Sequence, residues 1–337
     1  MGFPIERFRR LCVTFGAMKP LQGRVALVAG ATRGAGRGIA CALGEAGATV
    51  YCSGRSVHGK PATEGRRETI NQTAEMVTAR GGKGIAIRCD HTKESDVKKL
   101  VGRIQREQKG KLDILVNDVW GGDALTEFGK TFWKLSLDKG LAMLQQAVHS
   151  HIITSRYAVP LMIEHAKTKK GRGLIVEITD GDFFGYRGNL FYDLVKISVI
   201  RLAMAMAYEL RKTRITAFAV TPGFLRSEAM LDNFGVKEEN WHDAGKKDPN
   251  FLHSETPLFV GRAIAALASD PNVKKKSGQV LSSWNLSDEY GFTDSDGSRP
   301  HWGHHSAKTY GTWKKFDATL YSYFWESPMS VVFPDWP

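Results

Sequence analysis

Short apolar runs alternate with segments of helical periodicity along most of this chain. The first run, RVALVA at 24–29, has the character of a buried strand, and glycines follow it at once. Strands are predicted within 24–29, 49–56, 83–90, 112–122, 171–182, 214–230 and 278–283. Helices are predicted to end near Gly47 and to span 68–79, 94–109, 140–165, 191–212 and 257–269, with loops at 57–68, 123–139 and 231–255. This alternation predicts an α/β fold, a doubly wound parallel sheet that binds ligands at the carboxyl ends of its strands.

The turn after the first predicted strand is rich in glycine. Within GATRGAGRG at 30–38, Gly30, Gly34 and Gly36 leave backbone N–H groups free to approach a pyrophosphate at a helix N-terminus. Thr32 and Arg33 of the same turn are further candidate phosphate contacts. The spacing is G-x-x-x-G-x-G, which differs from the general G-x-G-x-x-G fingerprint, and glycine-rich turns are common. The turn alone is therefore weak evidence for a nucleotide site.

The end of the second predicted strand bears on the choice of cofactor. An NAD enzyme usually places an acidic residue there to hold the ribose diol, whereas this chain has Ser53, Gly54 and Arg55. Arg55 and Arg33 can instead meet a 2′-phosphate with charge-assisted hydrogen bonds. NADP is favoured over NAD, with a surface position as the alternative for each arginine.

Tyr192 and Lys196 lie four residues apart on the helix predicted at 191–212. That spacing puts a phenol and an ammonium on one helical face. A cation within about 4–6 Å favours the phenolate, so the pair could exchange a proton near neutral pH and protonate a ketone. A packed tyrosine beside an exposed lysine is the alternative.

Other polar residues at strand ends are less specific. Asp90 could hydrogen-bond an adenine or cap the next helix, and Asn117 could be a ligand or a scaffold amide. His149 and His151 fall on different faces of their helix, so neither suggests half of a metal site. A second group, His301, His304 and His305, has no companion acids or cysteines, so no metal site is predicted.

Composition narrows the class of protein. The 337 residues carry a net charge of +12, but the basic clusters are scattered and lack interleaved aromatic residues, so nucleic-acid binding is not expected. No apolar run approaches the roughly 18 residues of a membrane span. The four cysteines, Cys12, Cys41, Cys52 and Cys89, are isolated, which favours a reducing compartment, and we expect a cytoplasmic protein.

The two ends of the chain differ from its body. Residues 1–20 form an expected N-terminal arm, residues 21–286 the nucleotide-binding domain, and residues 287–337 an aromatic-rich C-terminal extension. The extension contains Trp302, Trp313, Phe316, Tyr321, Tyr323, Phe324, Trp325 and Trp336. Because so many exposed rings would form a sticky patch, we expect them to pack on the body, a partner subunit or the pocket mouth.

Taken together, residues 21–300 resemble the short-chain dehydrogenase/reductase family. The family's glycine loop is matched by Ala29-Gly30, Gly34 and Gly36, its adenine-side aspartate by Asp90 and its Y-x-x-x-K motif by Tyr192 and Lys196. Its P-G turn with a following hydroxyl is matched by Pro222, Gly223 and Ser227. The resemblance implies a single-domain Rossmann fold and an NADP-dependent oxidoreductase that forms dimers or tetramers. In such enzymes the tyrosine protonates the carbonyl oxygen, and the lysine lowers its pKa and binds the nicotinamide ribose.

The chain departs from the family pattern at three places. The family's Asn-Asn-Ala-Gly appears as 117–120, NDVW, which keeps Asn117 and brings Trp120 towards the nicotinamide side. No serine stands at the catalytic position; counting 13 residues back from Tyr192 gives Thr179, and aligning the strand end allows Thr179 or Asp180. We choose Thr179, because a hydroxyl can both donate and accept. The family's helix-four asparagine has no convincing match, with Ala147 or Gln145 near its place.

These features predict an NADP-dependent carbonyl reductase or alcohol dehydrogenase. By resemblance, Tyr192, Lys196 and Thr179 are the catalytic residues. The expected substrate pocket is aromatic, which favours an apolar or aromatic carbonyl substrate; its candidate residues are Trp120, Asp180, Phe183, Phe184, Tyr186 and Phe224. The missing serine also motivates an alternative, a catalytically impaired NADP-binding protein that acts as a redox sensor or scaffold.

Overall fold

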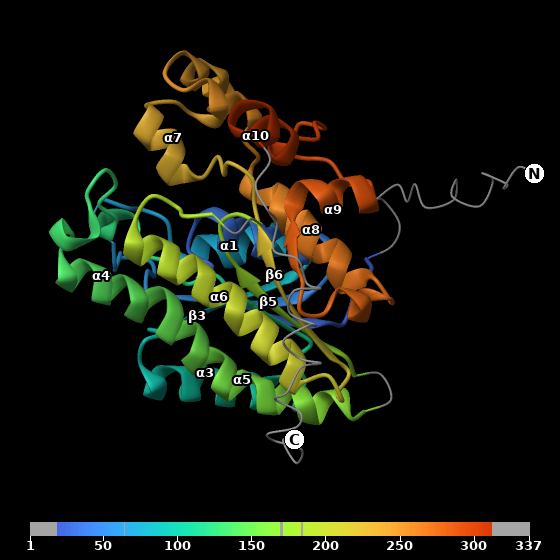
Figure 1. The fold of residues 1–337 in the computed structure, drawn as a ribbon. Coiled ribbons are helices and arrows are strands. Elements are labelled where there is room, and N and C mark those ends of the chain that lie inside the picture. Colours follow the sequence, from blue (N-terminus) through green and yellow to red (C-terminus); the bar gives the residue numbers. More distant parts are fainter. Residues whose placement is uncertain (1–18, 64, 169–170, 183–184, 312–337) are drawn as a thin grey trace, which may run out of the picture.

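Seven parallel strands form the centre of the molecule (Figure 1). The computed structural model describes residues 19–63, 65–168, 171–182 and 185–311. The strands are β1 (Val25–Ala29), β2 (Thr49–Gly54), β3 (Lys83–Arg88), β4 (Ile114–Asn117), β5 (Gly173–Ile178), β6 (Ile215–Thr221) and β7 (Val280–Ser282). Their spatial order is β3-β2-β1-β4-β5-β6-β7, with every pair parallel. The predicted doubly wound sheet is confirmed, and its order reverses between β1 and β4, where such sheets bind ligands.

Helices cover both faces of this sheet. One face carries α1 (Gly34–Glu45), α2 (Ile70–Ala79), α8 (Pro257–Ser269) and α9 (Ser283–Tyr290). The other carries α3 (Glu94–Glu107), α5 (Ser150–Ala166) and α6 (Leu190–Glu209). In β1, alternate side chains enter the two cores: Ala26 and Val28 pack on the first face, and Val25 and Leu27 on the second. Burial on both faces explains why this strand is an unbroken apolar run.

Two predicted segments differ from the structure. The helix expected at 140–165 begins earlier, as α4 (Leu137–Leu144), because the Ser136 side chain accepts a hydrogen bond from the Lys139 backbone and caps it. A π-helical segment, Gln145–His149, then joins α4 to α5. The loop expected at 231–255 includes most of α7 (Glu228–Phe234), followed by 3₁₀ turns at Glu238–Lys246 and Pro249–His253.

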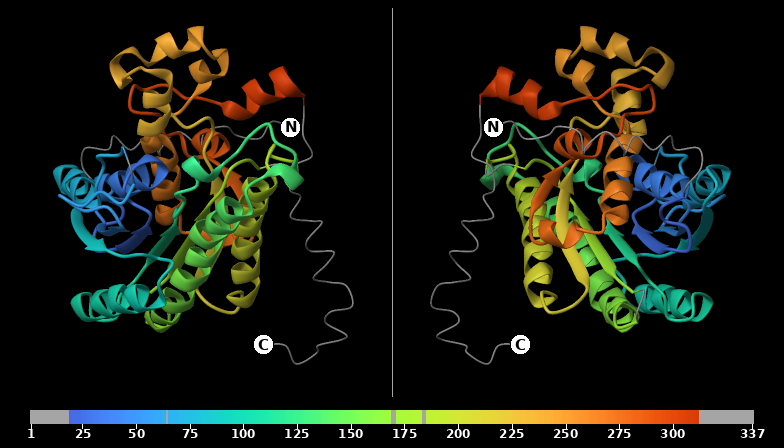
Figure 2. Two further views of the ribbon diagram at one scale, coloured as in Figure 1. Left: turned by 90° about the vertical axis from the view of Figure 1, so that its left-hand side faces the viewer. Right: turned by 90° about the vertical axis from the view of Figure 1, so that its right-hand side faces the viewer.

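The C-terminal part of the described chain contributes to the body. Helix α9 runs across residue 286, and α10 (Trp302–Tyr310) follows. Figure 2 shows α10 beside α7 and the 3₁₀ turns, beyond the carboxyl ends of the strands. The remaining extension lies outside the described residues, with Trp313, Phe316, Tyr321, Tyr323, Phe324, Trp325 and Trp336. Among the residues that are described, no helix is long and apolar enough to cross a membrane.

Candidate active site

A cleft of about 650 Å³ opens at the carboxyl end of the sheet. It is lined by residues that follow β1 to β6, and so by most of the residues that the sequence singled out. Those that line it are Gly30, Thr32, Arg33, Gly34, Arg55, Asp90, Trp120, Thr179, Asp180, Tyr192, Lys196, Pro222, Gly223, Phe224 and Ser227. Gly36, Asn117 and Tyr186 do not line it, and Phe183 and Phe184 lie outside the described residues. One cavity therefore joins the glycine turn to the tyrosine.

The glycine turn is shaped by close backbone packing. Gly30 has φ +93°, and a Cβ added there would stand 2.3 Å from the Asp118 carbonyl oxygen. A Cβ at Gly36 would stand 2.4 Å from the Gly30 carbonyl oxygen, so this glycine is needed for packing although it does not line the cleft. The glycines let the backbone of this turn, the glycine cradle, lie close to its neighbours at the start of α1, as the approach of a pyrophosphate requires.

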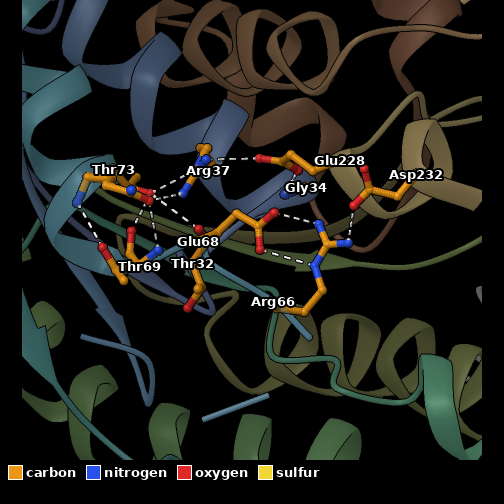
Figure 3. Close-up of polar contacts among 10 residues, drawn as sticks. Thr32, Gly34, Arg37, Arg66, Glu68, Thr69, Thr73, Glu228 and Asp232 are labelled. Atoms are coloured by element: carbon orange, nitrogen blue, oxygen red, sulfur yellow. Dashed lines mark hydrogen bonds and ion pairs between the residues drawn. The ribbon is translucent and has the colours of Figure 1, made fainter. Parts of the chain in front are cut away.

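A carboxylate occupies this cradle. Glu228, on α7, accepts a hydrogen bond from the Gly34 backbone N–H at 2.8 Å and pairs with Arg37 at 3.1 Å (Figure 3). An oxygen anion is thus held at the N-terminus of α1, where the helix dipole and the arginine both favour negative charge. The donors at this place fit a phosphate group.

The loop after β2 is fastened to α7 near the same place. Arg66 binds Glu68 through two hydrogen bonds and Asp232 at 2.6 Å (Figure 3). Thr69 caps α2, and Arg37 donates to Thr73, which ties α1 to α2. The end of the loop expected at 57–68 is therefore fastened to α7.

Arg55 and Arg33 both line the cleft, as the sequence argument for NADP requires. Arg55 donates a hydrogen bond from Nη2 to the side-chain oxygen of Gln146 at 3.2 Å. Ser53 donates to the Val28 carbonyl oxygen and contacts His91, so its hydroxyl is used inside the fold.

Asp90 and Asn117 have local partners. The Asp90 carboxylate accepts from the backbone N–H and the hydroxyl of Thr92 while lining the cleft, whereas α3 begins after Lys93 without a side-chain cap. Asn117 is fully buried and donates to Ser155 and Glu177. The structure thus gives Asn117 the scaffold position of the two that were considered.

Glu177 and His151 form a buried pair that sequence reasoning missed. The Glu177 carboxylate lies 2.6 Å from His151 Nδ1, and His151 Nε2 contacts the Val119 carbonyl oxygen at 3.1 Å. An acidic residue in the apolar strand IVEI was the available signal, because a buried carboxylate needs partners. The pair supports the backbone of β4 where it reaches the cleft.

Asp118 is a further cleft residue beside the glycine turn. Burial raises the pKa of Asp118 to about 7, although the charges of Lys196 and His151 and a hydrogen bond from the Gly36 backbone act to lower it. Its carboxyl group therefore keeps its proton to a higher pH than an exposed aspartate would.

Tyr192 and Lys196 lie together in the cleft on the first turns of α6, which Asn189 caps. The Tyr192 hydroxyl donates to Asp180 Oδ2 at 2.6 Å. Lys196 Nζ lies 4.3 Å from the centre of the Trp120 ring and 5.4 Å from that of Tyr192. The expected shared face is observed, and Trp120 stands beside it.

The titration of the pair differs from the expectation. Burial, followed by the charge and hydrogen bond of Asp180, raises the pKa of Tyr192 well above its ordinary value. Burial lowers the pKa of Lys196, although the charges of Asp180, Asp118 and Asp123 act to raise it. In this state the phenol is not made acidic by its neighbour, because the nearest charge to the hydroxyl is a carboxylate.

Thr179 does not face the phenol. Its Oγ1 donates a hydrogen bond to the backbone carbonyl oxygen of Lys196 at 2.8 Å. Asp180, the alternative at the strand end, is the residue in contact with Tyr192. The expected placement of Thr179 is therefore corrected. Because β5 ends at Ile178 and the chain turns there, the side chain of Asp180 is the one that reaches the Tyr192 hydroxyl.

Aromatic rings wall the reacting end of the cleft. Trp120 and Phe128 meet the Tyr192 ring edge-on at 5.4 and 5.7 Å, and Phe224 meets Trp302 at 5.6 Å. Phe128 and Trp302 had not been assigned to the pocket in particular, while Tyr186, expected there, is 63% exposed and outside it.

Near the π-helical segment, Gln146 lines the cleft rather than Gln145 or Ala147. Within the described residues no group of histidine, cysteine and acidic residues could hold a metal ion.

Comparison with known proteins decides the family. Residues 24–237 match the family described as short chain dehydrogenase. The chain belongs to the short-chain dehydrogenase family. As a short-chain dehydrogenase it is an oxidoreductase that uses a nicotinamide cofactor, NAD or NADP.

Individual relatives agree with this. The chain is 36% identical over 282 residues to dehydrogenase/reductase SDR family member 1 of Mus musculus, covering 82% of this chain and 85% of the relative, and 34% identical to the Homo sapiens protein over the same shares. The crystal structure of a hydroxysteroid dehydrogenase from Escherichia coli aligns with a TM-score of 0.61 at 24% identity, covering 79% of this chain and 98% of that one. The latter supports the fold of this short-chain dehydrogenase.

Proposed function

We propose that this short-chain dehydrogenase interconverts a carbonyl and an alcohol on an apolar or aromatic small molecule, with NADP as cofactor and Tyr192 as the general acid and base. The observation that carries the proposal is the single cleft that joins the glycine cradle to Tyr192 and Lys196. The cofactor, when bound, supplies or accepts the hydride.

The cradle supports cofactor binding through the residues of the turn. Gly30, Gly34 and Gly36 let the backbone approach the pyrophosphate, and the anion that the Gly34 amide and Arg37 hold in this structure is a carboxylate of the chain itself. We assign Arg33 and Arg55 to the 2′-phosphate that distinguishes NADP from NAD, an assignment supported by their place in the lining of the same cleft. We assign Thr32, Asp90, Pro222, Gly223 and Ser227 to the same site because they line the cleft beside it.

The chemical step is assigned to residues at the other end. Tyr192 is proposed to give its proton to the carbonyl oxygen during reduction, and Lys196 to hold positive charge beside it. The bond from Tyr192 to Asp180 supports a neutral phenol as the resting state, ready to donate. Asp180, rather than Thr179, is assigned to the position next to the tyrosine.

The rings of Trp120, Phe128, Phe224 and Trp302 support an aromatic or apolar substrate body.

We further propose a cytoplasmic homo-oligomer, a dimer or tetramer, in which the apolar face of α6 contacts a second subunit. Sedimentation of the purified chain tests the assembly.

A second function rests on Asp180. A carboxylate beside Tyr192 raises the pKa of the phenol, which would impair turnover in a protein that binds NADP as a sensor or scaffold. The deciding experiment is a panel of ketones, aldehydes and quinones with NADPH, scored by loss of nicotinamide absorbance. A reductase consumes NADPH with at least one carbonyl; a sensor binds NADPH, measured by calorimetry, and consumes none.

A further inference from the structure

Asp180 puts a carboxylate at the reacting end of the cleft. Its Oδ2 accepts the Tyr192 hydroxyl at 2.6 Å, and its side chain lines the cleft together with Lys196. An ionised carboxylate only accepts hydrogen bonds, so it cannot donate to a carbonyl oxygen as a hydroxyl would. A neutral ketone would therefore meet, beside the phenol, a group that repels the charge developing on its oxygen.

Further charged groups lie around Asp180 and Tyr192. Asp118 and Asp123 both act on Lys196, whereas Arg187 is the cation that lowers the pKa of Tyr192, against burial and Asp180. Arg187 donates to the backbone carbonyls of Asp180, Gly181 and Gly185, and pairs with Asp193 at 3.0 Å. In a chain of net charge +12, the reacting end thus holds the carboxyl groups of Asp118, Asp123 and Asp180 near the cations Lys196 and Arg187.

Aromatic rings surround the same place. The rings of Trp120 and Phe128 stand against Tyr192, and Phe224 and Trp302 also line the cleft. The faces of such rings attract cations, most strongly where water is excluded. Lys196 Nζ already lies over Trp120 at 4.3 Å, so this ring accepts a positive charge.

We propose that the substrate is a ketone or aldehyde with a positively charged nitrogen close to its carbonyl group, and that Asp180 is the counter-ion for that nitrogen. This inference rests on the proposed reductase function and names its substrate class. A cation that engages Asp180 releases the Tyr192 hydroxyl towards the carbonyl oxygen and offsets the alkoxide charge. The carbonyl carbon gains a hydride from the dihydronicotinamide, which is thereby oxidised, and the oxygen gains the Tyr192 proton, which solvent restores.

A matched pair of ketones tests the proposal. One is phenacyl trimethylammonium, and the other is its neutral isostere with a tert-butyl group in place of the trimethylammonium. We expect kcat/KM to be at least about tenfold higher for the cationic ketone. The ammonium group also activates its own carbonyl by induction, so the test is the change in this ratio. Asp180→Asn should lower the ratio by at least about fivefold, while Asp138→Asn, which removes an exposed carboxylate on α4, should leave it unchanged.

Two results would overturn the assignment. One is a wild-type ratio at or below unity, which decides the matter even where Asp180→Asn fails to fold. The other is an equal loss of activity for both ketones in Asp180→Asn, since Asp180 would then act only on Tyr192.

A binding measurement separates this inference from the reductase function. Benzyltrimethylammonium, added without cofactor, should change the tryptophan fluorescence of the wild-type protein and bind at least about tenfold more weakly to Asp180→Asn. Benzyl alcohol, the neutral probe, should bind both proteins alike. Cation binding without turnover of any carbonyl would support Asp180 as counter-ion and contradict the reductase; turnover without discrimination would contradict the counter-ion alone.

Discussion

At the scale of single residues, the sequence located the reacting pair but not its surroundings. Tyr192 and Lys196 could be paired because their four-residue offset is a local property of one helix. Thr179 and Asp180 could not be told apart, since β5 ends at Ile178 and the alternation of side chains no longer fixes which residue faces the cleft. The rise in the pKa of Tyr192 was missed because its first cause, burial, and its second, the charge of Asp180, both depend on the tertiary fold.

Asp180→Asn should lower the pKa of Tyr192, because it removes a negative charge that, after burial, raises it most. Reduction needs the protonated phenol, so its rate is present below that pKa and lost above it. The falling alkaline limb of kcat should therefore move to lower pH in the variant. A pH profile of ketone reduction measures this, and a limb that stays in place or moves upward would contradict the contact with Asp180.

Arg55→Ala should weaken the binding of NADPH by about 10–100-fold and leave that of NADH nearly unchanged, because only NADPH carries the 2′-phosphate. Calorimetric titration with each nucleotide gives the two affinities. Arg103→Ala, which removes an arginine of α3 paired with Glu107, is the control. Equal losses for both nucleotides would mean that Arg55 does not read the phosphate.

At the scale of elements, the long helices and buried strands were foreseeable, whereas α7 was not. A helix of seven residues has too few turns for its apolar period to stand out from a loop. Its importance lies in long-range contacts: Glu228 reaches Gly34, and Asp232 reaches Arg66. Such contacts join segments more than 160 residues apart in the chain.

Glu228→Gln should increase the affinity for NADPH by about tenfold, because a phosphate no longer has to displace a carboxylate from the Gly34 amide and Arg37. Fluorescence titration with NADPH measures the change. Glu239→Gln, at an exposed position of the following 3₁₀ segment, should have no effect. Unchanged or weaker binding in Glu228→Gln would show that Glu228 does not compete with the cofactor.

At the scale of the whole molecule, the alternation of strands and helices was sufficient to predict the sheet. It could not predict which distant segments close the cleft. Trp302 of α10 lies against Gly223 and lines the cavity, and the buried Glu255 accepts hydrogen bonds from Gly223 and Ser283. Glu255 thereby ties the turn after β6 to the start of α9.

The buried Glu255 should make stability depend on pH. Burial raises its pKa from 4.5 to about 8, against hydrogen bonds from Ser283 and Gly223. The folded state therefore holds a proton that the unfolded state releases. The stabilisation that comes from this proton is complete below about pH 4.5 and is lost as the pH rises through about 8.

The Tm of the wild-type protein, measured relative to that of Glu255→Gln, should fall between pH 6 and pH 9. The fall should be about 2–4 °C for each kcal/mol of unfolding free energy that is lost. Scanning calorimetry of both proteins measures the difference, in which the rest of the chain's titration cancels. A constant difference across this range would mean that Glu255 is ionised in the fold.

The central claim, that Tyr192 is the proton donor in a nicotinamide-dependent reduction, is tested most directly by Tyr192→Phe. With NADPH and a responsive ketone, we expect kcat to fall by about 10²–10⁴-fold while the Kd for NADPH changes by less than about threefold. Tyr208→Phe, on the same helix beside Arg211, should keep wild-type activity. Retention of most of the turnover by Tyr192→Phe would contradict the account.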